Sequence, residues 1–135
     1  MYRSVYIVLA IPGANHFKSA FDTLLVILSY WLMIYSVVLV EEHYIFRRGS
    51  FQTGYDLEGW NDRAKLPIGL AALGATAFGA VGVVLGMAQT WYVGVVGMKI
   101  GGPPFGGDIG FEMAGAFAAV SYPGLRYLEK KYMGR

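Results

Sequence analysis

The most extended apolar pattern in this chain covers residues 66–98, which include no Asp, Glu, Lys, Arg or His. The hydrocarbon core of a bilayer is about 30 Å thick, and a helix needs about 20 residues to cross it. We therefore predict a transmembrane helix over residues 67–90. Pro67 fits the first turn of this helix, because the N–H that proline lacks would have no partner there.

Two more apolar segments, residues 21–40 and 109–127, are long enough to cross a membrane. We expect Asp108 to cap the second of them and Glu112 to lie in its first turn, where the helix dipole favours negative charge. Pro123 is expected to kink or end this helix. The predicted fold class is an all-α integral membrane protein, with residues 1–135 forming a single transmembrane region that has three full transmembrane helices.

Residues 4–14 are also apolar but are too short to cross a bilayer alone. We interpret them as a partial helix, the second half of a helix whose first half is absent from this chain. A second interpretation is a signal peptide, because Arg3 precedes the apolar run and small residues follow it. The sequence leaves both interpretations open.

Basic residues concentrate on one side of the predicted helices. Residues 41–65 and the C-terminal segment hold eight of them, namely Arg47, Arg48, Arg63, Lys65, Arg126, Lys130, Lys131 and Arg135. The opposite side holds only Lys18 and Lys99. An excess of Lys and Arg in short flanking segments marks the cytoplasmic side of a membrane. We therefore predict a cytoplasmic loop at 41–65 and a cytoplasmic tail at 128–135.

The composition agrees with a membrane location and excludes several classes of function. Hydrophobic residues make up 56% of the chain and charged residues 15%, too few to coat a small soluble domain. A net charge of +2 is too weak to indicate a nucleic-acid partner. Because the chain has no cysteine, it has no disulfide and no thiolate metal site. We expect the lipid bilayer to be its main environment, and we expect no cofactor, no metal and no enzyme activity.

Segment 21–40 supplies the candidates for a transport path or gate, namely Asp22, Ser29, Tyr30 and Trp31. An ionisable group within a membrane is a functional candidate, and aromatic rings can stack on flat ligands. Gln89 and Glu112 lie at the corresponding outer ends of the other two predicted helices. Hydrogen bonding to a neighbouring helix, capping or anchoring at the interface explains the same residues without transport.

Two other clusters have the wrong spacing for chemistry. In Glu41-Glu42-His43, neighbouring side chains on a helix point in different directions, so we favour a polar helix end over a proton relay or metal site. The Gly/Pro-rich residues 101–108 lack the Lys-Ser/Thr pair of a phosphate-binding loop and indicate a tight turn. Neither cluster points to a catalytic site.

Gly82 and Gly86 have a spacing that allows two helix backbones to approach closely, so we expect them to be helix-packing residues. The same feature supports an alternative function. A small membrane-embedded interaction or scaffold protein could bind other transmembrane helices through the glycine-rich helix 67–90.

Several motifs, in this order and spacing over nearly the whole chain, resemble the C-terminal part of fungal purine-cytosine permeases of the nucleobase:cation symporter-1 family. They include Asn15-His16-Phe17, Leu28-Ser29-Tyr30-Trp31, Glu41-Glu42-His43, Trp60-Asn61-Asp62-Arg63, Gly86-Met87-Ala88-Gln89 and Gly106-Gly107-Asp108. The resemblance implies a twelve-helix fold with a five-plus-five inverted repeat. Segments 21–40, 67–90 and 109–127 then match its last three helices.

The resemblance implies symport of purines or cytosine with a proton across the plasma membrane by the full-length family. It also implies that most substrate-binding helices lie upstream of this segment. We therefore expect this chain to be a C-terminal fragment that does not transport alone, and we expect segment 21–40 to be its part of the transport core.

Overall fold

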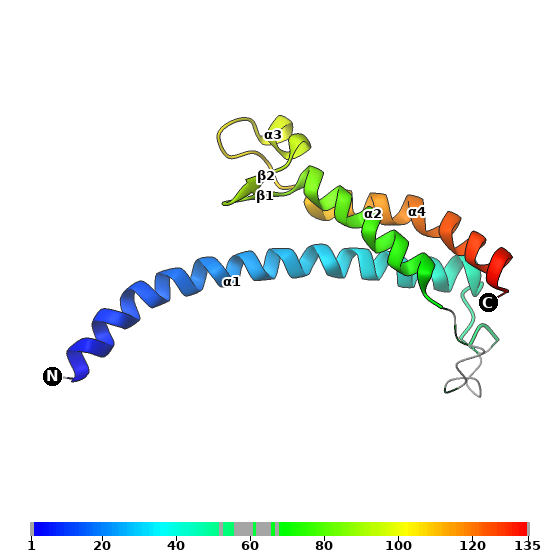
Figure 1. Ribbon diagram of the computed structural model, residues 1–135, viewed down its shortest axis with the longest axis horizontal. Helices are drawn as coiled ribbons and strands as arrows, with labels where there is room; N and C mark the ends of the chain where they lie inside the picture. Colours follow the sequence, from blue (N-terminus) through cyan, green and yellow to red (C-terminus); the bar gives the residue numbers. More distant parts are fainter. Residues whose placement is uncertain (1, 52, 56–60, 62–65, 67, 135) are drawn as a thin grey trace.

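The computed structural model describes residues 2–51, 53–55, 61, 66 and 68–134. The elements in chain order are α1 (Tyr2–Glu41), a π-helical turn η1 (Glu42–Phe46), α2 (Leu70–Gly86), β1 (Ala88–Gln89), β2 (Tyr92–Val93), α3 (Val95–Gly101) and α4 (Gly110–Met133). Helix α1 runs the length of the molecule, α2 returns along its second half, and α4 follows the direction of α1 beside α2 (Figure 1). The first half of α1 projects beyond the other helices.

Helix α1 differs from the prediction because it joins the segments 4–14 and 21–40 into one helix of 40 residues. Residues 14–20 contain neither glycine nor proline, so nothing in that stretch ends a helix. By length and composition, residues His16–Phe46 are the one helical stretch in the described part of the chain that is able to cross a membrane. The stretch ends where Arg48 and Gly49 adopt left-handed φ angles of 53° and 67°.

Helix α2 is shorter than the predicted 67–90. It has 17 residues, or about 25 Å of helix, and it is apolar throughout. After Gly86 the backbone becomes extended at Met87, and β1 then pairs with β2 in an antiparallel hairpin. A side chain at Gly94 would place its Cβ 2.3 Å from the carbonyl oxygen of Leu85, so only glycine lets the hairpin fold back here. Pro67 lies outside the described residues.

Of the two expectations for Pro123, that it kinks or that it ends the last helix, the second is wrong, because α4 continues through Pro123 to Met133. Proline removes one backbone donor, and tertiary packing compensates for that loss. Tyr122 and Leu125, on either side of the proline, pack against Ala71 and Ala75 of α2. Glu112 lies in the first turn, as expected.

Small residues set the distance between the helices. Ile34 of α1 packs with Ala114 and Ala118 of α4, and a Cβ at Gly79 would lie 2.7 Å from the Ile34 side chain. Such residues let backbones approach closely, which stabilises helix pairs in lipid by van der Waals packing. The core is therefore a thin layer of alanine and glycine with a few larger side chains.

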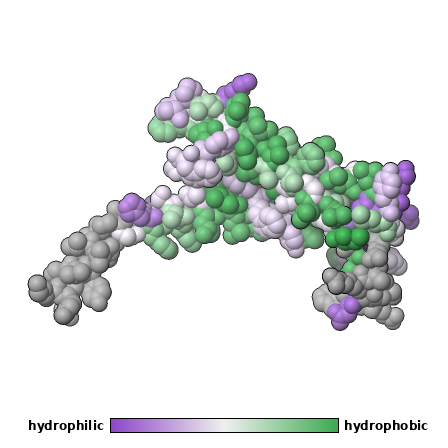
Figure 2. Space-filling model, viewed as in Figure 1, coloured by the Kyte–Doolittle hydropathy of each residue, from purple (hydrophilic) through white to green (hydrophobic). Residues whose placement is uncertain are grey.

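The surface agrees with a membrane location. Figure 2 shows apolar surface along the middle of the molecule, over α1, α2 and α4, and hydrophilic patches toward its ends. Many large apolar side chains are exposed there, among them Leu24, Leu28, Leu32 and Val81. Surface of this kind is stable against lipid chains rather than water. The number of helices that cross the bilayer stays a prediction.

Candidate functional site

A polar cluster joins three parts of the chain at the end of the molecule that carries the hairpin. The hydroxyl of Tyr30 on α1 donates a hydrogen bond to Oδ2 of Asp108, which precedes α4. The side-chain amide of Gln89 in β1 donates to the same oxygen at 3.0 Å and to the Tyr30 hydroxyl at 3.1 Å. Tyr30 is buried, with 4% of its surface exposed. We call Tyr30, Gln89 and Asp108 the hub.

Asp108 is the centre of the hub and also anchors the start of α4. Its second oxygen, Oδ1, accepts a hydrogen bond from the backbone N–H of Gly110 at 2.9 Å. The first N–H groups of a helix have no intrahelical partner, and this bond satisfies one of them, although the N-cap position itself is held by Ile109 and Asp108 lies one residue before it. Asp108 thus fixes α4, the hairpin and the middle of α1 relative to one another.

A hollow of about 430 Å³ lies next to the hub, between α1 and the hairpin. It is lined by Lys18, Ser19, Asp22, Thr23, Val26, Ala88, Gln89, Thr90 and Asp108. These side chains offer two carboxylates, one ammonium group, hydroxyls and an amide. Such a wall can both donate and accept hydrogen bonds, which suits a small polar molecule with donors and acceptors along its edge.

The structure brings together two of the four transport-path candidates. Asp22 lines the hollow, and Tyr30 bonds to Asp108 on the wall of the same hollow. The Ser29 hydroxyl instead turns back to the carbonyl of Val26 at 2.7 Å. Trp31 is 53% exposed and lines an apolar groove of about 350 Å³ between α1 and α2. Sequence reasoning missed the contributions of Lys18 and Asp108 to this site.

A second polar cluster, which we call the ion network, lies at the opposite end of α2 and α4. Arg126 of α4 lies 3.2 Å from Glu42 of η1 and 3.1 Å from Glu129. Tyr122 also donates to Glu42 at 2.9 Å, and Arg47 contacts it at 3.2 Å. Arg126 and Glu129 are buried at 5% and 6% exposure. Burying a charge costs free energy unless an opposite charge pairs with it. We therefore assign this network a role in joining the helices.

The glycine side of α2 faces α4 within the same chain. A Cβ at Gly82 would lie 2.6 Å from the carbonyl oxygen of Met113, and one at Gly86 would lie 3.1 Å from that of Ile109. Both glycines are buried. In the described part of the chain this side of α2 is therefore covered by α4.

The exposed apolar surface, the small-residue core and a helix long enough to cross a bilayer are typical of a helical membrane protein. The chain is 44% identical to the purine-cytosine permease fcyB of Emericella nidulans over 97% of its own length and 25% of that protein's length. It is 41% identical to a purine-cytosine permease of Saccharomyces cerevisiae over 94% of its length and 23% of the relative. The chain is thus homologous to a segment of the fungal purine-cytosine permeases, which confirms the resemblance read from its motifs.

A more distant relative has a different named substrate. The vitamin B6 transporter of Saccharomyces cerevisiae is 29% identical over 97% of this chain and 30% of that protein. The chain spans about a quarter of the length of the permeases that it matches. No model of a protein family matches the chain. No solved structure matches it either.

Proposed function

We propose that this chain serves in the transport of nucleobases, purines or cytosine, across the plasma membrane with a coupled proton. The observation that carries the proposal is 40–44% identity to purine-cytosine permeases over nearly the whole chain. The hollow beside the hub supports it, because nucleobases carry hydrogen-bond donors and acceptors on a flat ring. Asp22 and Tyr30 are the residues that we propose for the path or its gate, with Ser29 and Trp31 in the same helix.

We further propose that the chain works together with other transmembrane helices and does not transport alone. The hollow is open, and much of the surface of α1 is exposed, including Leu28, Trp31 and Tyr35. A transport path needs a site near the midplane that is enclosed by helices. The distribution of basic residues supports a cytoplasmic loop at 41–65 and a cytoplasmic C-terminus.

The alternative function, a scaffold that binds other helices through the glycine-rich segment, receives no support from the geometry. Gly79, Gly82 and Gly86 face α1 and α4 rather than open surface. A helix of another protein would have to displace α4 to reach them.

A chimera tests the proposed function. This chain replaces the matching segment of the Emericella nidulans permease in cells that lack their own purine-cytosine permeases, and uptake of labelled cytosine and adenine is measured. We expect uptake above an empty-vector control for the chimera and none for the chain expressed alone. A chimera that reaches the plasma membrane but takes up neither base contradicts the proposal. Uptake by the chain alone contradicts the need for further helices.

A further inference from the structure

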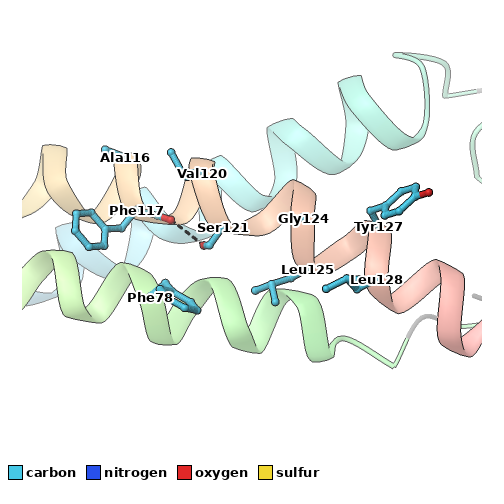
Figure 3. A pocket seen from close by; sticks show the side chains of 9 residues that line it. All are labelled: Phe78, Ala116, Phe117, Val120, Ser121, Gly124, Leu125, Tyr127 and Leu128. Carbon is cyan, nitrogen blue, oxygen red and sulfur yellow. Dashed lines mark hydrogen bonds between the residues drawn. The ribbon is translucent and has the colours of Figure 1, made fainter.

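An apolar groove of about 840 Å³ runs along the outer side of α2 and α4. Figure 3 shows Phe78 on α2 and, farther along, Leu125 and Leu128 extending from α4 toward α2. Val120 is 84% exposed and Phe78 is 53% exposed, so the groove is open to the surroundings of the helices. It lies away from the hub and the hollow, and the proposed transport function makes no use of it.

The groove has no unsatisfied polar group along its middle. The hydroxyl of Ser121 donates to the carbonyl of Phe117 at 2.8 Å, within its own helix (Figure 3). Gly124 leaves an open space in the wall, since an added Cβ would meet no atom within 4 Å. The lining is therefore apolar and offers contacts only to an apolar occupant.

A basic residue, Lys131, comes one helical turn after the last residues of α4 that line the groove. Lys131 follows Tyr127 by four residues on α4, so both side chains lie on the same face of the helix. Lys131 is exposed and makes no ion pair with any residue that the structure describes; its ammonium group lies 6.0 Å from the ring of Tyr132. Lys130, by contrast, points to a different face, where its ammonium group lies 4.8 Å from the ring of Phe46.

We propose that this groove holds an acyl chain of an anionic phospholipid, whose phosphate pairs with Lys131. The charge complementarity at the end of an otherwise apolar groove identifies this occupant. Helices that pack against each other in lipid have small residues at their contact. Phe78, Val120 and Tyr127 instead protrude here, so a flexible acyl chain fits between them better than a helix does. Anionic lipids are abundant in the cytoplasmic leaflet, which agrees with the proposed cytoplasmic C-terminus.

Photolabelling tests the proposal. The full chain is reconstituted into phosphatidylcholine vesicles that contain a minor share of phosphatidylserine with a photoreactive acyl chain, and matched vesicles carry the same acyl chain on phosphatidylcholine. Labelled residues are mapped by mass spectrometry. We expect label on Phe78, Phe117 and Val120, about fivefold more from phosphatidylserine, since one Lys near a membrane surface is worth about 1 kcal/mol. Both leaflets contain the probe, so the result does not depend on orientation.

Matched variants separate the groove from its charge. Gly124→Leu adds a side chain whose Cβ meets no atom within 4 Å, and it is expected to fill part of the groove and reduce labelling severalfold at unchanged helix content by circular dichroism. Lys131→Ala is expected to abolish the difference between the two lipids, and Lys131→Arg to keep it. Lys99→Ala, at the far end of the molecule on α3, is the control and is expected to keep both the labelling and the difference.

Four results overturn the proposal. Two concern the lipid preference: equal labelling by the two lipids in the unaltered chain, and a preference for phosphatidylserine that survives Lys131→Ala. The other two concern the labelled positions: label spread evenly over the exposed face of α1, and crosslinks between two copies of the chain through the groove. Because none of these readouts involves uptake, failure here is distinguishable from failure of the nucleobase chimera.

Discussion

The carboxylate of Glu129, near the end of α4, accepts a hydrogen bond at 2.9 Å from the backbone N–H of Gly69, directly before α2 begins. Its other oxygen accepts from the N–H of Ala71 at 3.3 Å. The first N–H groups of α2 have no partner inside the helix, so one helix caps another. Arg126 pairs with the same carboxylate and with Glu42, which adds η1 to the junction.

Removing this carboxylate should strongly destabilise the protein. Glu129→Ala leaves Arg126 buried with one partner fewer and leaves two helix N–H groups without an acceptor. Breaking a buried ion pair on one side costs about 3–5 kcal/mol. Thermal unfolding in detergent, followed by circular dichroism, measures the loss. Lys131→Ala is the control, because Lys131 is exposed and forms no ion pair within the described part of the chain, and such a surface substitution changes stability by less than about 0.5 kcal/mol.

The Tyr30 hydroxyl should contribute to the rigidity of the hub. Tyr30→Phe removes the donor to Asp108 while keeping the ring, at a cost of about 1–2 kcal/mol in unfolding free energy. In the permease chimera we also expect a lower uptake rate. Tyr35→Phe removes a hydroxyl from the same helix at a position that is 52% exposed and should leave both measurements unchanged. Equal effects of the two substitutions would show that Tyr30 has no special role.

Asp22 should affect transport more than folding. Asp22→Asn keeps the size of the side chain but removes a charge from the wall of the hollow. If the carboxylate accepts a hydrogen bond from the nucleobase, uptake by the chimera falls by at least about tenfold, because a hydrogen bond to a charged group is worth about 1.5–3 kcal/mol. Glu112 is an exposed residue in the first turn of α4, so Glu112→Gln is the control for the loss of a negative charge at the same end of the molecule. Unchanged uptake by Asp22→Asn removes Asp22 from the proposed path.

Two glycine substitutions should have effects of opposite sign. Gly82→Ala places a Cβ 2.6 Å from the Met113 carbonyl and pushes α2 and α4 apart, at a cost of about 1–3 kcal/mol. Gly124→Ala meets no atom within 4 Å and should stabilise α4 by up to about 1 kcal/mol, since alanine favours helix more than glycine does. Unfolding in detergent compares the two variants directly. A stabilised Gly82→Ala variant contradicts close packing at that position.

The pattern of apolar residues predicted the helical membrane character of the chain but not the ends of its helices. The span prediction for 67–90 assumed that an uncharged stretch is one helix. In the structure the helix ends at Gly86, and Gly94 lets the chain turn back at the hairpin, a matter of backbone packing that apolar composition does not reveal. In the same way, packing of Tyr122 and Leu125 on α2 carries α4 past Pro123.

The hub was only partly predictable. Tyr30 stood out as a polar aromatic residue in an apolar segment, and Asp108 as a helix cap. Their hydrogen bond joins positions 78 residues apart, and Glu42 and Arg126 in the ion network are 84 apart. Such contacts depend on how the helices pack against one another, and this packing cannot be read from the residue pattern of a single sequence. The family resemblance led to the proposed transport function, but it did not predict the geometry of the hub or of the ion network.

The hub and the ion network have a joint mechanical consequence. They join α1 and the η1 turn that directly follows it to the region around α4 at two separate points, Tyr30 with Asp108 and Glu42 with Arg126. Sliding α1 by one helical turn, about 5.4 Å, would break both contacts at once. Between them, the Ile34 side chain of α1 packs against Ala114 and Ala118 of α4 and opposes the same slip by steric contact alone. The two contacts together therefore fix the axial register of α1 relative to α4.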